Sequence, residues 1–380
     1  DSSVWLDDYH RCLAPAILRS ENPRRTIAHF WHVPWPDPDI FSHAPHGEEL
    51  IAGLLGNDLI GFQIPSHAEN FLKCAESCPE ASVDHDAMTV SRQGRITRVR
   101  AFPISIDFHR FDAISASAET SEMVTEIRSK HRLPGLVGLA ADRLDYTKGI
   151  VQRLDALDIF FRRYPVFIGS FTFVQIAVMT RNCLPYRSYR REVEERIAAI
   201  NGKYGTSEWQ PVLYLGNKLE QEVLAAWYRL ADVAIITPLR DGMNLVAKEY
   251  VASRCGDTGA LILGREAGAA AELKDAIQVD PFDAGTFASA IHRALTMPER
   301  EKRERMAALR DTVRKNTVFH WVGDILDELS IIPAVKRGAR HALSNTEEIR
   351  ERLSGKDLFL CLDFDGTLAP IVESPETAAM

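Results

Sequence analysis

Short apolar runs alternate with longer amphipathic stretches along most of the chain. Three apolar runs near the start have the length of strands: Val4–Leu6, Thr26–Phe30 and Leu59–Gln63. The stretches that follow them have the apolar spacing of helices, at 10–19, 48–55 and 67–77. Residues 81–100 change to polar alternation around Gly94, which predicts a hairpin, with a further strand at 99–106. Buried strands that alternate with helices predict a parallel sheet with crossover helices.

The same alternation restarts at about residue 134, after a looser stretch at 107–113. Strands are predicted at 136–140, 171–178, 211–215, 233–237, 259–263 and 277–279. Helices are predicted at 150–163, 186–201, 219–231, 243–254, 267–273 and 285–297. Interleaved charges at 299–316 indicate a solvated helix, and we expect the amphipathic segment 320–330 to close this half.

A chain of 380 residues is too long for one ordinary core, so two domains and a tail are expected. We expect the domains to be 1–112 and 113–330, followed by a polar linker at 331–356 and the start of another domain at 357–380. The chain begins close to an interior strand and ends a few residues into something new. We therefore expect a fragment of a longer protein whose first domain is incomplete.

Composition excludes several classes of function. Charged residues make up 26% and the net charge is −8, which argues against general nucleic-acid binding. No apolar run approaches the length of a membrane span, and no basic-plus-apolar leader opens the chain. The six cysteines are scattered, which is typical of buried thiols in a reducing compartment. We expect a cytoplasmic protein with no nucleic-acid or membrane partner.

Two polar loops follow buried strands about ninety residues apart, at 142–149 and 238–249. In a parallel sheet, loops that leave the carboxyl ends of strands line the ligand crevice. The first loop contains two cations, Arg143 and Lys148, which suit a diphosphate. The second contains an Asp-Gly turn that leads into a helix, whose free N–H groups suit a phosphate, and Glu249 follows about two turns later. Together these groups suggest a nucleotide-sugar site.

Four segments in order, VWLDDYH, HFWHVPWP, DRLDYTKG and TPLRDGMNLVAKEYVA, resemble the retaining glycosyltransferases typified by trehalose-6-phosphate synthase. The resemblance covers roughly residues 3–330. It implies the α/β arrangement called GT-B, in which two Rossmann-like, doubly wound domains face a cleft. The second domain would bind the nucleotide sugar and the first, here incomplete, would bind the acceptor.

The resemblance also implies roles for residues of the second half. Arg143 and Lys148 would stabilise the charge that develops on departing UDP. The donor would also contact a segment after the fourth strand and a carboxylate that binds the ribose: Asp241, Gly242, Met243, Asn244, Leu245, Val246 and Glu249. Outside this motif, an Asp and a Glu at a helix opening would more often be caps and dipole partners.

The acceptor side is implied by shorter matches. Asp8 and Tyr9 would contact the acceptor sugar, and His32 would lie beside the reacting centre. Arg181 would bind the phosphate of the acceptor. Three departures weaken the assignment of the acceptor: Asp7 where the family usually has histidine, Cys183 where aspartate is common, and Gly-Arg-Glu at 264–266 where Ser-Glu-Phe is usual.

The tail has a second signature. Residues 358–370 form an apolar strand that ends in Asp-x-Asp-Gly-Thr and resembles the first motif of haloacid-dehalogenase-type phosphatases. Asp363 would be the phosphoryl-accepting nucleophile and Asp365 the acid/base, with Mg²⁺ required only by the complete phosphatase domain. We expect the transferase part to use no metal or other cofactor.

The leading hypothesis is a retaining glucosyltransferase that moves glucose from UDP-glucose to glucose 6-phosphate, giving trehalose 6-phosphate. One alternative is another phosphorylated acceptor, as in glucosylglycerol-phosphate synthases. Another is a non-catalytic regulatory homologue. The sequence leaves open the nucleotide base, the formation of a homo-oligomer and the activity of this chain alone.

Overall fold

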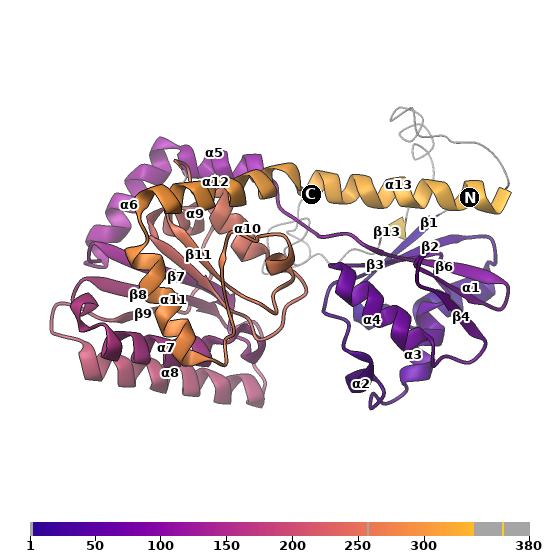
Figure 1. The fold of residues 1–380 in the computed structure, drawn as a ribbon, viewed down its shortest axis with the longest axis horizontal. Helices are drawn as coiled ribbons and strands as arrows, with labels where there is room; N and C mark the ends of the chain where they lie inside the picture. The colour runs from indigo at the N-terminus through magenta and orange to yellow at the C-terminus, as the bar shows by residue number, and fades with distance from the viewer. Residues whose placement is uncertain (1–2, 257, 338–358, 361–380) are drawn as a thin grey trace. The chain divides into compact units, whose positions relative to one another are not determined.

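The computed structural model describes residues 3–256, 258–337 and 359–360, and its internal contacts divide the chain into two units (Figure 1). Unit 1 contains the described residues up to Ile104 together with the described residues from His320 onward. Unit 2 is the continuous segment Ser105–Phe319. Each unit has its own sheet, flanked by helices.

Unit 1 contains a mixed seven-stranded sheet in the order β13-β1-β2-β3-β6-β5-β4. The strands are β1 (Ser3–Asp7), β2 (Thr26–Trp31), β3 (Leu59–Phe62), β4 (Ala81–Asp84), β5 (Thr89–Arg92), β6 (Arg95–Ala101) and β13 (Phe359–Leu360). Strands β1, β2, β3 and β6 are parallel. The antiparallel hairpin predicted around Gly94 is formed by β5 and β6, and β4 adds a further antiparallel strand. The strand expected at 99–106 begins earlier and ends earlier, as β6 at Arg95–Ala101. The helices are α1 (Ala14–Glu21), α2 (Pro38–Phe41), α3 (Gly47–Leu54) and α4 (Pro65–Ala75), with a 3₁₀ turn η1 at Tyr9–Arg11.

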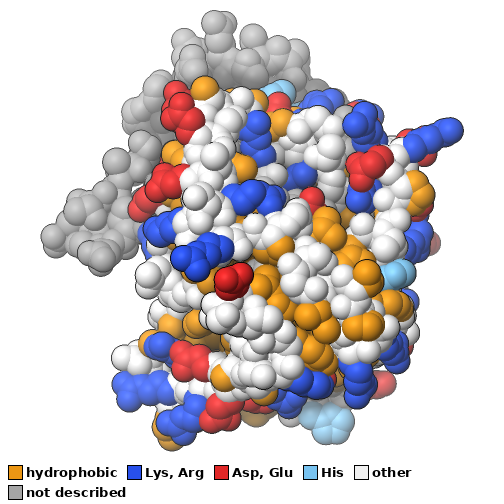
Figure 2. Space-filling model, turned by 90° about the vertical axis from the view of Figure 1, so that its left-hand side faces the viewer, with side chains coloured by type: hydrophobic (Ala, Val, Ile, Leu, Met, Phe, Trp, Pro, Cys, Tyr) orange, Lys and Arg blue, Asp and Glu red, His pale blue; other side chains and the backbone are white. Residues whose placement is uncertain are grey.

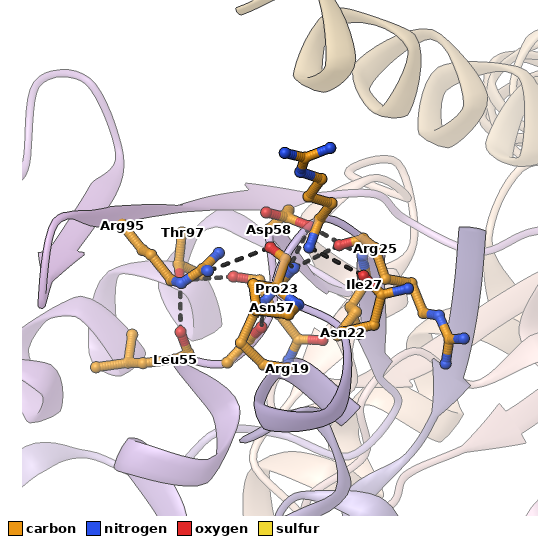
Figure 3. Close-up of polar contacts among 12 residues, drawn as sticks. Arg19, Asn22, Pro23, Arg25, Ile27, Leu55, Asn57, Asp58, Arg95 and Thr97 are labelled. Carbon is orange, nitrogen blue, oxygen red and sulfur yellow. Dashed lines mark hydrogen bonds and ion pairs between the residues drawn. The ribbon is translucent and has the colours of Figure 1, made fainter. Parts of the chain in front are cut away.

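A buried arginine fastens α1 to the sheet of unit 1 (Figure 3). The guanidinium of Arg19 donates to Asp58 Oδ2 at 2.7 Å, to the carbonyl of Gly56 at 3.0 Å and to the carbonyl of Arg25. Asp58 Oδ2 also accepts the N–H of Ile27 on β2 at 2.9 Å. Because both partners of the ion pair are buried, each depends on the other for compensation of its charge.

Helix α13 (Val318–Arg337) belongs to unit 1 from His320 onward. Its Trp321 donates to the carbonyl of Phe102 at 3.1 Å and packs edge-on against Phe30, with ring centroids 5.1 Å apart. Arg100 forms an ion pair with Glu328 at 3.1 Å. The segment 320–330 was expected to close the second domain, and the structure instead returns it to the first. The helix also continues into the expected linker, which therefore begins with a helical segment.

Unit 2 contains a fully parallel six-stranded sheet in the order β12-β11-β10-β7-β8-β9. The strands are β7 (Leu136–Arg143), β8 (Phe171–Val178), β9 (Val212–Leu215), β10 (Val233–Ile236), β11 (Ala260–Gly264) and β12 (Ile277–Val279). All six strands lie where the apolar runs predicted them. Strands β7 and β10 are hydrogen-bonded neighbours, so the two loops that follow them leave the same edge of the sheet side by side.

The described part of unit 2 contains eight helices. They are α5 (Phe108–Ala116), α6 (Ala118–Lys130), α7 (Ile150–Arg163), α8 (Leu184–Tyr204), α9 (Gln221–Leu230), α10 (Leu245–Ala252), α11 (Ala284–Thr296) and α12 (Glu299–Lys315). Of these, α5 and α6 pack on other helices. Three segments are 3₁₀ turns: η2 (Tyr146–Lys148), η3 (Pro165–Phe167) and η4 (Gly268–Ala271), the last where a helix was predicted.

Helices α5 and α6 were not predicted. Asp107 and Ser117 accept the N–H groups of Arg110 and Thr120, each at 3.1 Å, and so cap the two helices. The boundary was expected at residue 112, whereas α5 as a whole lies in unit 2, where Arg310 donates to Asp112 at 2.7 Å. Cap residues followed by modest apolar periodicity were the available signal.

The surface has positive and negative side chains side by side. Figure 2 shows Lys and Arg next to Asp and Glu on the face it draws, with hydrophobic side chains gathered between them. On α12, Arg300 pairs with Glu304 at 2.7 Å and Arg305 with Glu301 at 2.8 Å, one helical turn apart. Such pairs support a solvated helix, as the interleaved charges predicted. No helix among the described residues is long and apolar enough to cross a membrane.

The phosphatase-like motif lies mostly outside the described residues. Asp363 and Asp365 are not among them, so their roles stay predictions. Of the predicted apolar strand, Phe359–Leu360 is described as β13, which pairs in parallel with Val4 and Trp5 of β1.

Candidate functional site

The loop that follows β7 is shaped by its own side chains. Asp145 Oδ1 accepts both the N–H and the hydroxyl of Thr147 at 3.0 Å, which closes the turn η2. Gly149 then adopts a left-handed conformation with φ of 65°, and a Cβ at this position would lie 2.3 Å from the carbonyl oxygen of Thr237. Only glycine fits here, because both the backbone angle and the close approach exclude a side chain. Because Gly149 lies against Thr237, which follows β10, the preceding residue Lys148 is placed near the end of β10.

A fully buried arginine, which sequence reasoning missed, contacts the backbone of this loop from the protein interior. Arg153 on α7 donates to Asp142 Oδ2 at 2.8 Å and to Gln175 Oε1 at 2.7 Å. It also reaches the hydroxyl of Thr237 at 3.3 Å and the carbonyl of Lys148 at 3.2 Å. One side chain thus connects residues of β7, β8 and the segment after β10 to the backbone of the loop that contains Lys148.

The loop that follows β10 is fixed by the segment after β11. Asp241 accepts from Gly268 N–H at 3.0 Å through its carbonyl, and Ala269 N–H donates to Met243 O at 2.7 Å. A Cβ on Gly268 would lie 1.9 Å from the carbonyl oxygen of Gly242. The Gly-Ala pair at 268–269 is therefore needed for close backbone packing, even though the residues at 264–266 differ from the usual family spelling.

The two loops meet through a short ion pair. Lys148 Nζ lies 2.6 Å from Asp241 Oδ2, and Leu239 N–H donates to Thr147 O at 2.7 Å. Asn244 Nδ2 donates to the same carboxylate oxygen of Asp241 at 3.2 Å. Arg143, the other predicted cation, is exposed at the end of β7. The structure therefore brings Lys148, Asp241 and Asn244 into one cluster.

Helix α10 begins beside this cluster. Asn244 has a left-handed backbone with φ of 80°, and its Oδ1 caps the helix by accepting Ala247 N–H at 3.2 Å. The helix places its first N–H groups, those of Leu245 and Val246, outside its own hydrogen-bond ladder. The N-terminal end thus presents positive partial charge next to Lys148.

Glu249 lies one turn further along α10 and accepts a hydrogen bond from the phenol of Tyr228 on α9, with 2.8 Å between Oη and Oε2. Burial raises the pKa of the Glu249 carboxyl, and the bond from Tyr228 opposes that rise. Tyr228 was not singled out from the sequence, where a tyrosine on a core-facing helix has no distinguishing mark.

Arg181, the predicted acceptor arginine, lies after β8. It donates to the hydroxyl of Tyr186 at 2.6 Å and lies over the same ring, with 5.5 Å to its centroid. Tyr186 in turn donates to Asp145 Oδ2 at 3.4 Å. A chain of hydrogen bonds therefore joins Arg181 to the loop that carries Lys148. Cys183, a departure from the usual spelling, is exposed at the start of α8.

The remaining predicted residues belong to unit 1, at the ends of β1 and β2. Asp8 has a positive φ of 59°, a strained backbone for a residue with a side chain, and its Oδ1 accepts His32 N–H at 3.3 Å. The carbonyl of Asp8 bonds His29 Nε2 at 2.9 Å, and burial lowers the pKa of His29 to about 4. Tyr9 follows with its ring stacked on His10, centroids 3.9 Å apart.

The ring of His32 is oriented by two buried partners. Ile104 N–H donates to Gln63 Oε1 at 3.1 Å, so the amide nitrogen of Gln63 faces His32 Nδ1 at 3.4 Å. An amide donor at Nδ1 assigns the proton to Nε2, which donates to Asp7 Oδ1 at 2.9 Å. Asp7, where the family usually has histidine, thus binds the histidine predicted to lie at the reacting centre.

Among the described residues, no group of three His, Cys, Asp or Glu side chains is arranged to bind a metal ion. The expectation that the transferase part needs no cofactor stays a prediction. The predicted donor and acceptor-phosphate residues all fall in unit 2, and Asp8, Tyr9 and His32 fall in unit 1.

Two α/β units, one with a mixed sheet and one with a fully parallel sheet, each with polar loops at the carboxyl ends of parallel strands, have the fold of the GT-B class, as the sequence predicted. The chain belongs to glycosyltransferase family 20, whose family model matches residues 1–331.

Three known proteins illustrate the similarity. The bifunctional trehalose-6-phosphate synthase/phosphatase of Thermoproteus tenax is 37% identical over 384 aligned positions, covering 99% of this chain and 52% of that protein. The α,α-trehalose-phosphate synthase (UDP-forming) of Burkholderia xenovorans, solved with glucose 6-phosphate, has a TM-score of 0.82 and 33% identity over 87% of this chain and 73% of its own. The N-terminal domain of trehalose-6-phosphate phosphatase from Candida albicans has a TM-score of 0.82 and 32% identity over 87% and 70%. The chain spans about half the length of the Thermoproteus tenax protein.

Proposed function

We propose that this chain provides the transferase part of a protein that moves glucose from UDP-glucose to glucose 6-phosphate, with retention of configuration, to give trehalose 6-phosphate. The observation that carries the proposal is the cluster in which Lys148, Asp241 and the start of α10 meet at one edge of the sheet. A cation and a helix N-terminus attract a diphosphate, and a carboxylate beside them can accept sugar hydroxyls.

In this proposal, Lys148 and Arg143 stabilise the negative charge that develops on the departing diphosphate. The bond between the anomeric carbon and the phosphate oxygen breaks as the acceptor hydroxyl oxygen attacks the same face. The proton of that hydroxyl passes to the departing phosphate. Arg181 binds the phosphate of the acceptor, and Asp8, Tyr9 and His32 contact the sugars. We further propose a cytoplasmic protein and leave homo-oligomer formation to measurement.

A second candidate is a domain that binds sugar nucleotides without transferring glucose. The similarity to the N-terminal domain of a Candida albicans protein named as a phosphatase favours it. The charge at position 7, where Asp7 binds the ring of His32, is a further reason to test transfer separately from binding. Another phosphorylated acceptor, such as glycerol 3-phosphate, remains the alternative within the same chemistry.

The first experiment measures UDP binding by calorimetry to the 380-residue chain and to Arg143→Ala and Lys148→Ala. We expect each substitution to weaken UDP by about tenfold or more, because charge-assisted bonds to phosphate are the strong ones. Arg162→Ala, an exposed arginine on α7, is the matched control and should leave the affinity unchanged. Absence of UDP binding by the folded chain would refute the proposed donor site.

The second experiment follows UDP release from UDP-glucose with glucose 6-phosphate or with glycerol 3-phosphate. Release with glucose 6-phosphate, together with trehalose 6-phosphate as the product, supports the leading proposal. Faster release with glycerol 3-phosphate favours the other acceptor. Tight UDP binding with no release in either case favours the binding domain.

A further inference from the structure

A buried tyrosine on α9 is the one described residue that donates a hydrogen bond to the carboxylate of Glu249. Tyr228 is 1% exposed, and its Oη lies 2.8 Å from Glu249 Oε2. The other oxygen, Oε1, accepts no hydrogen bond from the residues that the structure describes. A carboxylate has about four acceptor positions, so this arrangement uses one and leaves the others for a ligand.

The phenol is fixed from several sides. The carbonyl of Tyr228 accepts from Arg254 at 2.8 Å, which anchors the last turn of α9. Its ring packs edge-on against Tyr250, with ring centroids 6.4 Å apart and an angle of 81°. On α10, Lys248 forms a buried ion pair with Glu272 at 2.6 Å. Donor and acceptor of the Tyr228–Glu249 bond therefore belong to two helices that are each tied to their surroundings.

The pKa shifts suit a permanent donor on Tyr228 and a carboxyl on Glu249 whose ionised form this donor stabilises. Burial and the neighbouring charge of Glu249 raise the pKa of Tyr228 well above its usual value, so the phenol keeps its proton. The bond from Tyr228 lowers the pKa of Glu249 against the effect of burial, which favours the carboxylate. Without this donor, the pKa of the Glu249 carboxyl would rise further.

We propose that Tyr228 is a positioning residue that fixes the carboxylate of Glu249 for a vicinal diol, so that the site selects ribonucleoside over 2′-deoxyribonucleoside diphosphates. This inference rests on the proposed donor site and extends it to the class of nucleotide. A carboxylate fixed at one oxygen can accept both hydroxyls of a ribose. A site built to bond a hydroxyl discriminates strongly against an analogue that lacks it, because its buried polar group is then left unpaired.

The test compares UDP with 2′-deoxyuridine 5′-diphosphate by calorimetry on the 380-residue chain. We expect the native chain to prefer UDP by about tenfold or more, as for one hydrogen bond to a charged group. Tyr228→Phe should reduce this preference at least threefold, because it weakens UDP, which offers Glu249 two hydroxyls, more than the deoxy analogue, which keeps only the 3′-hydroxyl. The phenylalanine ring fills the same volume, so the fold is retained. A purely structural role would weaken both ligands equally.

Two further variants complete the comparison. Tyr250→Phe removes another buried phenol from the same core, one that contacts Ala231 O at 3.4 Å, and should leave the preference unchanged. Glu249→Gln should abolish the preference. If Glu249→Gln abolishes the preference and Tyr228→Phe leaves it unchanged, the positioning role is overturned while the donor site stands. If the native chain binds neither nucleotide, the donor site and the inference fail together.

Discussion

Replacement of Arg153 by methionine tests whether one buried cation supports the donor loops. The side chain is fully buried, at 0% exposure, and its partners are Asp142, Gln175, Thr237 and the carbonyl of Lys148. Methionine fills much of the same volume without a charge. The variant therefore leaves the carboxylate of Asp142 buried and without its guanidinium.

The expected cost follows from these contacts. Removal of one partner of a buried ion pair costs about 3–5 kcal/mol, because the other charge is left uncompensated. Gln175 Nε2 still donates to Asp142 Oδ2 at 3.3 Å, which moderates the loss. The buried oxygen of Gln175 and the carbonyl of Lys148 lose their donor, at about 1–3 kcal/mol for each group left unsatisfied. Because Gln175 still donates to Asp142, we expect a total at the lower end of this range, about 5 kcal/mol, and weaker UDP binding, since the Lys148 backbone loses a fixed support.

The assay is urea unfolding combined with hydrogen exchange of peptides covering 136–163. Exchange is needed because a chain with two units need not unfold in one step. Arg190→Met is the matched control: its ion pair with Glu194, 2.7 Å long, is exposed to solvent and contributes little to stability. The double variant Arg153→Met with Asp142→Asn should be more stable than Arg153→Met alone, because it also removes the buried charge of Asp142. A loss below about 1 kcal/mol for Arg153→Met, equal to that of the control, would refute the reasoning.

Three other predictions concern single groups. Because burial raises the pKa of Glu249, acidification should weaken UDP binding at a higher pH than protonation of an ordinary carboxyl would. Calorimetry between about pH 5 and 8 checks this, and the variant Glu249→Gln, which lacks this titration, corrects for protonation of UDP itself. Tyr186→Phe should raise the KM for glucose 6-phosphate several-fold with little change for UDP-glucose, because Arg181 loses its hydrogen bond to the Tyr186 hydroxyl; equal changes in both would contradict this. Arg19→Met should cost about 3–5 kcal/mol in urea unfolding, since it removes the guanidinium that compensates the buried charge of Asp58, and an unchanged midpoint would count against it.

The strands of unit 2 and the two polar loops at 142–149 and 238–249 could be predicted because their sequence signals are local. A continuous apolar run predicts a buried parallel strand, and a polar loop after it lies at the ligand edge. Lys148 and Asp241 are 93 positions apart, yet strands β7 and β10 pair directly, so the contact follows from the order of the sheet. The apolar pattern does not give that order, which comes from the structure.

The supporting residues could not be predicted for a physical reason. Arg153 and Tyr228 act through contacts between elements, and nothing in their immediate neighbours distinguishes them from an ordinary core-helix arginine or tyrosine. The placement of α13 was missed because an amphipathic helix has the same pattern whichever sheet it covers, and only contacts such as Trp321 with Phe102 decide. By contrast, the caps Asp107 and Ser117 were visible in the sequence and would have located α5 and α6.

The site residues that sequence reasoning named are bound to one another, which affects how a ligand can reach them. Lys148 is paired with Asp241 at 2.6 Å, and the ring of His32 is bound by Asp7 at 2.9 Å. A diphosphate that binds Lys148 must compete with the carboxylate of Asp241, and a sugar hydroxyl that takes over one oxygen of that carboxylate reduces the competition. Donor phosphate and donor sugar should therefore bind with positive cooperativity, so that UDP-glucose exceeds UDP in affinity by more than the added contacts alone would give.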